Sequence, residues 1–153
     1  MAEVGVPCQL DAAREQLVRA LVPGAEPREG AFEAIQIAKK CKRKLIMAGI
    51  IQDKIYFKEQ VQPFINDDDI CYLGSADPIE RDRILGNAAA LLHPINFEEP
   101  FGLSVVESFA CGTPVIAFNR GSMSEIIIDM KNGFLVTTVE EAASAVNKLS
   151  EID

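Results

Sequence analysis

Two glutamates, Glu99 and Glu107, stand eight positions apart, the first in a loop and the second in the apolar segment after that loop. Between them, Pro100 and Gly102 are typical of a turn, and residues 103–111 carry apolar side chains at helical spacing. An ionised carboxylate has two acceptor oxygens, which suit the paired hydroxyls of a ribose or a hexose. The pattern therefore predicts two acceptors for sugar hydroxyls, one on a helix and one on the preceding loop.

The junction between this loop and the helix is a predicted phosphate site. The first backbone N–H groups of a helix have no internal partners, and the peptide dipoles add partial positive charge there. Gly102, Leu103 and Ser104 would present such donors, and Gly102 has no Cβ to keep an anion away. A phosphate seat between two diol acceptors suits a nucleotide sugar.

Three further residues are secondary candidates or competitors. Glu98 is adjacent to Glu99, so either acid can be the one that faces a ligand. His93 is the only histidine, and it either ends a strand structurally or lines a sugar pocket, because one histidine cannot build a metal site or a triad by itself. Arg120 comes after a predicted strand, where its guanidinium either faces phosphate or sugar or lies in solvent.

Short apolar runs alternate with helical patterns along the chain from residue 31, which predicts a parallel sheet covered by helices on both faces. Ligands of such sheets bind beyond the carboxyl ends of the strands, so the candidate residues should share one edge. The predicted strands are 44–49, 69–74, 88–93, 115–118 and 134–136, and the predicted helices are 31–41, 53–64, 78–86, 103–111, 122–130 and 139–149.

The first thirty residues have a different pattern. Residues 10–21 show helical apolar spacing after a potential N-cap at Asp11, and prolines and glycines break the chain between residues 23 and 30. We therefore expect an atypical N-terminal segment, residues 1–30, and one folded domain, residues 31–153.

Composition limits the function classes. A net charge of −8 argues against a nucleic-acid partner, since the phosphate backbone generally needs a basic face. No apolar run approaches the length of a membrane span, and the N-terminus lacks the pattern of a secretory signal. The four cysteines have no metal-ligand or redox spacing, so we expect reduced thiols, a cytoplasmic location and no metal.

Residues 98–118 carry a family resemblance. Glu-Glu-Pro-Phe-Gly-Leu with Glu107, and then Ala-Cys-Gly-Thr-Pro-Val-Ile-Ala at residues 110–117, resembles the motif of retaining GT-B glycosyltransferases of family 4 type. The resemblance extends from about residue 30 to the C-terminus, through Leu-Leu-His-Pro at 91–94 and Gly-Ser-Met-Ser-Glu at 121–125. It implies a Rossmann-like domain, one half of a GT-B fold, which binds the nucleotide-sugar donor.

The resemblance also implies roles for single residues. Glu107 would hold the ribose, the N–H groups of Leu103 and Ser104 the diphosphate, and Glu99 the donor sugar. His93 and Arg120 stay secondary candidates: His93 is grouped with Glu99 as a catalytic residue, and Arg120 with Gly102, Leu103, Ser104 and Glu107 as a donor-binding residue. The nucleotide sugar would be the donor substrate, with no further cofactor.

The family pattern is broken before residue 30. The family opens this domain with a central strand and a turn whose arginine and lysine neutralise the donor diphosphate, but those positions hold Gly24 and Glu29, with Arg28 out of register. The strand also conflicts with the helical pattern. Either the region after Leu17 joins the sheet through tertiary context, or the sheet lacks its middle strand and the segment packs differently, for instance in a dimer.

Complete enzymes of this type have a second domain that binds the acceptor, and residues 31–153 match only the donor domain. We therefore expect the isolated chain to bind a donor but hardly to turn it over. The alternative is a non-catalytic, partner-binding subunit of a split transferase. A sugar-nucleotide epimerase of the same architecture is a weaker third hypothesis, because a single domain with one histidine hardly supplies the acid–base groups.

Overall fold

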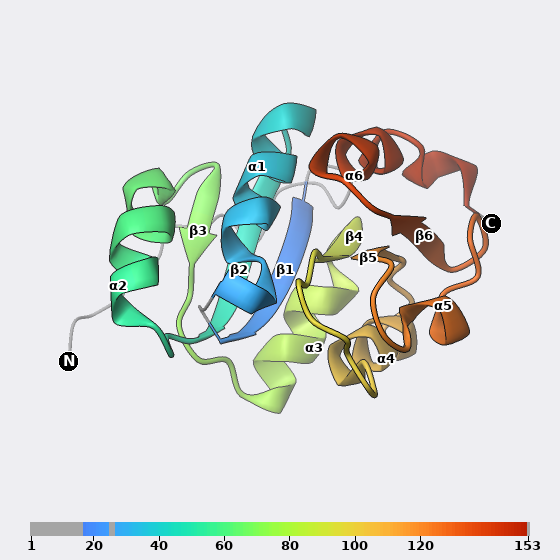
Figure 1. Cartoon of the computed structure of the whole chain (residues 1–153), viewed down its shortest axis with the longest axis horizontal. Coiled ribbons are helices and arrows are strands. Elements are labelled where there is room, and N and C mark those ends of the chain that lie inside the picture. Colours follow the sequence, from blue (N-terminus) through green and yellow to red (C-terminus); the bar gives the residue numbers. More distant parts are fainter. Residues whose placement is uncertain (1–16, 25–26, 153) are drawn as a thin grey trace.

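The structure, a computed structural model, describes the backbone of residues 17–24 and 27–152 and the side chains from residue 27 on. In this described part, strands form one parallel sheet in the order β3-β2-β1-β4-β5-β6 (Figure 1). The strands are β1 (Leu17–Gly24), β2 (Lys44–Ile50), β3 (Ile70–Tyr72), β4 (Ala90–His93), β5 (Val115–Phe118) and β6 (Gly133–Val136). The helices are α1 (Ala31–Cys41), α2 (Lys54–Tyr56), α3 (Pro78–Gly86), α4 (Leu103–Ala110), α5 (Met123–Ile126) and α6 (Val139–Val146).

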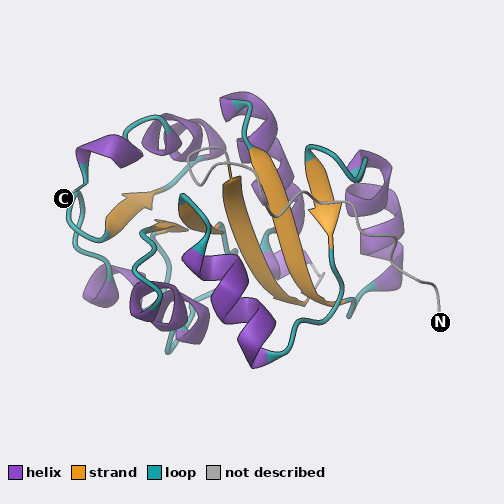
Figure 2. Cartoon of the chain, turned by 180° about the vertical axis from the view of Figure 1, so that it is seen from behind, coloured by secondary structure: helices purple, strands orange, loops and turns teal. Residues whose placement is uncertain are grey.

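The sheet has an apolar core on each face, as the alternation of side chains along a strand requires. In β4, Ala90 and Leu92 join the cluster formed with α1 and α6, whereas Leu91 joins the cluster formed with α3 and α4. Seen from behind, α3 crosses in front of the sheet while α1 lies behind it (Figure 2). The prediction of a three-layer α/β fold with a parallel sheet is confirmed.

The N-terminal helix prediction is wrong where the structure describes it. Residues 17–24 form β1, the strand between β2 and β4, and residues 10–16 lie outside the described part. The backbone N–H and C=O groups of two flanking parallel strands need partners, and a strand supplies them where a helix cannot. Tertiary pairing therefore overrides the local helical spacing, which is the first of the two possibilities left open by the sequence.

Two other predicted helices are shorter or less regular than expected. The helix at 53–64 begins as predicted, with Asp53 Oδ1 accepting from Tyr56 N at 2.9 Å, but continues as a π-helical turn and a 3-10 turn around Pro63. The helix expected at 122–130 ends at Ile126. The Asn132 side chain accepts from Ile128 N at 2.8 Å and so takes a backbone group that a longer helix would use.

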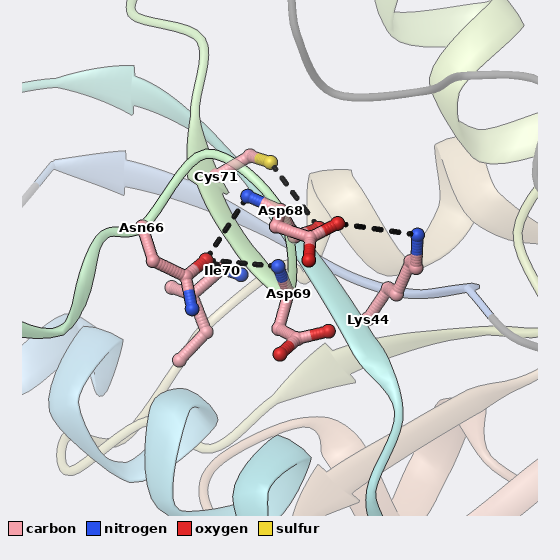
Figure 3. Close-up of polar contacts among 6 residues, drawn as sticks. All are labelled: Lys44, Asn66, Asp68, Asp69, Ile70 and Cys71. Atoms are coloured by element: carbon pink, nitrogen blue, oxygen red, sulfur yellow. Dashed lines mark hydrogen bonds and ion pairs between the residues drawn. The ribbon is translucent and has the colours of Figure 1, made fainter.

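The loop before β3 is organised by one side chain (Figure 3). Asn66 Oδ1 accepts from the backbone N–H groups of Asp68, Asp69 and Ile70 at 2.8–3.0 Å, and Lys44 Nζ lies 3.7 Å from Asp68 Oδ1. Because Lys44 opens β2, these contacts start β3 in register beside it. They lie at the amino end of the strands, opposite the edge where the candidate residues gather.

The cysteines depart from expectation at one position. Cys71 in β3 is disulfide-bonded, whereas Cys41 and Cys111 carry free thiols. The expectation of reduced thiols throughout is therefore wrong for Cys71. Within the described residues, no helix has the length and apolar character needed to cross a bilayer.

Candidate functional site

A cavity of about 450 Å³ lies at the carboxyl ends of β2 and β3 and beside the start of α4. The strand order reverses at β1, since the chain moves outward through β2 and β3 on one side and through β4, β5 and β6 on the other. Ligands of open parallel sheets bind at this kind of reversal. The described lining is Glu29, Ala48, Gly49, Ile50, Ser75, Ala76, Arg81, Glu99, Phe101, Leu103, Ser104 and Glu107.

A larger cavity, about 670 Å³, lies at the opposite edge of the sheet, near Pro114 and the end of α6. Its described lining mixes apolar side chains such as Phe109 and Val146 with polar and charged ones such as Arg43 and Lys131, and it includes no carboxylate. Convergent polar groups mark a ligand site better than volume does, and the smaller cavity holds the open amides and carboxylates. We therefore take the smaller cavity as the candidate site.

Glu99 closes the loop before α4 and lines the candidate cavity. Its Oε1 accepts from Phe101 N and from Gly102 N, both at 3.2 Å. The described part of the chain supplies no hydrogen-bond donor to its other oxygen, Oε2. One carboxylate oxygen thus holds the loop in shape, while the second stays available to a ligand.

The Glu98 side chain bonds to the turn after β5 and is not part of the described cavity lining. Its Oε2 accepts a hydrogen bond from Gly121 N in the turn after β5, and Ser122 N donates to Glu99 O at 2.7 Å. Gly121 has φ 56°, and a Cβ there would lie 2.3 Å from Glu99 O, so only glycine fits against the loop. Of the two adjacent acids, Glu99 is the one that lines the cavity, as the family register implies.

The start of α4 presents open donors. Leu103 and Ser104 line the cavity, and among the described residues no protein acceptor meets their N–H groups. Gly102 differs: its N–H donates to Glu99, and the place of its missing Cβ is filled by Met123 Cε at 2.7 Å. Its φ of 69° shows why glycine stands there, since the chain turns into the helix through the left-handed region.

Glu107 lies one turn further along α4, on the same cavity, and has a cationic neighbour. Arg81 Nη1 on α3 lies 3.8 Å from Glu107 Oε1, and each side chain is 39% exposed. Sequence reasoning missed Arg81. The available signal was a cation in the first turn of the helix after β3, where the helix dipole disfavours positive charge.

His93 ends β4 in the protein interior, only 3% exposed, and does not line the cavity. Burial lowers the pKa of its imidazole to about 4, although the nearby Glu99 carboxylate acts to raise it. The imidazole is therefore neutral at neutral pH. Its Nε2 is buried with no hydrogen-bond partner among the described residues.

Arg120 lies in the exposed turn after β5 and is not part of the described cavity lining. Its backbone holds the turn, with Arg120 N donating to Phe118 O at 2.8 Å and Arg120 O accepting from Met123 N at 3.2 Å. The structure thus brings together Glu99, Leu103, Ser104 and Glu107 at one cavity, and leaves Gly102, His93 and Arg120 outside its described lining.

The turn after β1 brings an acid to the cavity. Glu29, where the family resemblance implies lysine, is half-buried in the lining. Arg28 stacks instead on the Phe97 ring, with its Cζ 5.4 Å from the ring centroid. The described lining therefore holds three carboxylates and one cation, Arg81.

Comparison with known proteins gives the family. The model of the group 1 glycosyl transferases matches residues 12–153. The chain belongs to this family. The group 1 domain has the Rossmann-like architecture of one half of a GT-B fold, which the strand order and the helices on both faces already indicated.

Among the curated relatives of this group 1 domain, trehalose synthase of Pyrococcus horikoshii is 27% identical over 150 residues, which are 90% of this chain and 36% of that protein. The alpha-1,3/1,6-mannosyltransferase ALG2 of Dictyostelium discoideum is 30% identical over 93 residues, 60% of this chain and 22% of that protein. The chain thus spans about a third or less of the length of these relatives.

Solved structures share the fold of the group 1 domain. Anabaena Alr3699/HepE, crystallised with UDP and glucose, has a TM-score of 0.82 at 26% identity, and the match covers 94% of this chain and 41% of that one. The C-terminal domain of a group 1 glycosyl transferase, LpcC of Francisella tularensis, has a TM-score of 0.72 at 22% identity, with 95% of this chain and 88% of that domain covered.

Proposed function

We propose that this chain is the C-terminal, donor-binding domain of a retaining GT-B glycosyltransferase of family 4 type, and that its substrate is a nucleoside-diphosphate sugar. One observation carries the proposal: the open N–H groups of Leu103 and Ser104 begin a helix at a cavity that Glu99 and Glu107 also line. Support comes from the similarity to a protein crystallised with UDP and glucose and to an isolated C-terminal domain.

In this proposal each group acts on one part of the donor. Glu107 accepts hydrogen bonds from the ribose hydroxyls, and the free oxygen of Glu99 accepts from the sugar. The N–H groups of Leu103 and Ser104 bind the diphosphate, whose oxygen gains negative charge as its bond to the sugar breaks. Preorganised donors aimed at that oxygen stabilise the departing group, while the acceptor hydroxyl comes from another domain or chain.

The site test is nucleotide binding measured by titration calorimetry with UDP, GDP and ADP. We expect at least one of them to bind, and Glu107→Ala to weaken it about 10- to 100-fold, the loss typical of a hydrogen bond to a charged group. Glu125→Ala is the matched control, since Glu125 is an exposed glutamate outside the described cavity lining. No binding at millimolar nucleotide, or equal affinity of the two variants, would overturn the proposal.

A second candidate function is favoured by the charge of the cavity. Among the described lining residues, Glu29, Glu99 and Glu107 oppose a single cation, and the positions of the family's diphosphate-binding cations hold Gly24 and Glu29. Such a lining suits a module that has lost the donor and is kept as the partner-binding subunit of a split transferase. Two results together would select this function: co-purification of a chain that carries an acceptor domain, and no nucleotide binding by the wild-type subunit or by its Glu29→Lys variant.

A further inference from the structure

Arg81 is placed at the candidate site by non-local packing. It lies in the first turn of α3, lines the cavity, and meets Glu107 across the α3–α4 contact with Nη1 3.8 Å from Oε1. The acids of its own helix turn are engaged otherwise, because Asp77 Oδ1 accepts from Glu80 N and Glu80 Oε2 accepts from Asp77 N in a capping box. Arg81 therefore faces the acid of the next helix.

The stability of the fold does not explain this cation. An ion pair whose members are each 39% exposed adds little to stability, because solvent screens it. A positive side chain in the first turn of a helix is also opposed by the helix dipole. A position that is poor for stability and lies on a ligand cavity is better explained by the ligand.

The carboxylates that line the cavity would repel an anionic ligand, and Arg81 is the one cation in the described lining that can offset their charge. The Glu107 carboxylate is proposed to accept sugar hydroxyls, yet it lies one helical turn from the amides proposed to bind a diphosphate, and Glu29 adds a further carboxylate to the cavity. A carboxylate beside an anionic ligand is repelled and turns away unless a cation holds it. Arg81 Nε is buried and has no hydrogen-bond partner among the described residues, whereas the terminal nitrogen Nη1 meets Glu107.

We propose that Arg81 is a positioning residue for the ribose. It binds Oε1 of Glu107, offsets its charge, and leaves Oε2 directed to the hydroxyls of the nucleotide. This inference rests on the proposed function, since it assigns a specificity role within the same donor site. It does not assign Arg81 to the diphosphate itself, and the two roles have different consequences for a ligand that lacks one ribose hydroxyl.

The experiment pairs each nucleotide with its 2′-deoxy form: UDP with dUDP, GDP with dGDP and ADP with dADP, using the pair that the wild-type protein binds. Loss of a hydroxyl bound by an ionised acceptor should weaken the wild type about tenfold or more. The quantity compared is the ratio of the Kd for the deoxy form to the Kd for the ribo form. In Arg81→Met we expect this ratio to fall to about two, because the Glu107 carboxylate has lost the ion pair that positions it. Arg83→Met is the matched control on an exposed position of the same helix, and should keep the full ratio.

Arg81→Lys is the second variant, and thermal unfolding checks that each protein is folded. Lysine keeps the positive charge and reaches Glu107 with one ammonium group. The deoxy-to-ribo Kd ratio should therefore recover most of its wild-type value. If Arg81→Met weakens the ribo and deoxy forms equally, Arg81 binds phosphate and the positioning role is overturned. If neither the affinities nor their ratio differ from those of the wild type, Arg81 has no role at the ribose or the phosphate, and the positioning role is again overturned. If the wild type binds no nucleotide at all, the proposed function fails first, and the inference fails with it.

Discussion

The two connections that meet at the carboxyl edge of the sheet differ in how they treat an anionic ligand. The loop after β4 leads into α4 with the open N–H groups of Leu103 and Ser104 and with Glu99 locked in the loop by its own backbone bonds. The turn after β1 brings the carboxylate of Glu29 to the same cavity. Under the proposed function, the first connection binds anions through its backbone N–H groups, and the second repels them through the charge of Glu29.

The difference teaches that the two halves of such a site are built by different means. Amide donors at a helix start depend on the fold, and survive as long as the loop keeps its shape. Charged side chains in a turn change with single substitutions and leave the fold intact. We call the loop of residues 98–104 the geometric half of the site, and the turn that carries Glu29 the charged half. Substitutions that disturb the geometric half should cost the most stability and nucleotide affinity, and a substitution in the charged half should change the affinity less.

The largest effect is expected from Gly121→Ala, which attacks the geometric half. An added Cβ at φ 56° would lie 2.3 Å from Glu99 O and 2.4 Å from Glu99 N, so the loop must move. We expect a loss of about 4 kcal/mol in the free energy of unfolding and loss of nucleotide binding. Urea denaturation and calorimetry measure the two effects.

Gly112→Ala is the matched control for that substitution. Gly112 has φ 74°, but no atom lies within 4 Å of its added Cβ, so only the backbone conformation is penalised, by about 1 kcal/mol. Equal losses of unfolding free energy in the two variants would show that the contact of Gly121 with Glu99 does not shape the loop. That result would contradict the geometric half of the comparison.

The next largest effect is the pH dependence of stability that His93 causes. His93 is the last residue of β4, where the loop to α4 begins. Its pKa is about 4 in the folded protein against 6.5 ordinarily, so between these values the unfolded chain binds a proton that the folded chain does not. Stability therefore falls as the pH drops from 6.5 to 4, by about 3 kcal/mol from this group. Stability above pH 6.5 is unaffected by it.

Urea denaturation across pH 4–7, for the wild type and His93→Gln, measures this contribution. The carboxylates titrate in both proteins, so the difference between the two curves isolates the histidine. We expect the wild type to lose more stability on acidification than the variant does. Parallel curves would mean that His93 is solvated, and that the interior at the end of β4 is looser than the structure has it.

The smallest effect is a gain in nucleotide affinity, which we expect from Glu29→Lys. This substitution tests the charged half of the comparison. The substitution supplies the lysine that the family resemblance implies at this position, and it removes a carboxylate from the lining. We expect nucleoside diphosphates to bind about tenfold more tightly, with a smaller gain for the nucleoside, because the added charge acts on phosphate. Glu125→Lys controls for net charge. An unchanged or weaker affinity would show that the turn after β1 does not face the phosphates.

Much of the chain could be predicted from local pattern. The helix at 78–86 was predicted with its proline start, and the strand at 115–118 agrees residue for residue with β5. These elements carry their own signals: a proline in the first turn, and a proline before an apolar run. The motif around Glu99 and Glu107 likewise indicated a glycosyltransferase domain, and the match of the group 1 glycosyl transferase model over residues 12–153 confirms that coarser assignment.

Tertiary structure decided the rest, because the deciding contacts join residues far apart in the chain. β1 is a strand only because β2 and β4 leave a place between them, which local helical spacing cannot reveal. Gly121 separates the adjacent acids Glu98 and Glu99, and packing of α3 on α4 brings Arg81 to Glu107. By itself the sequence determined most of the elements after residue 30 and the chemistry of the α4 loop, since backbone geometry and residue type act locally. Which charges face that loop depended on packing across the whole sheet.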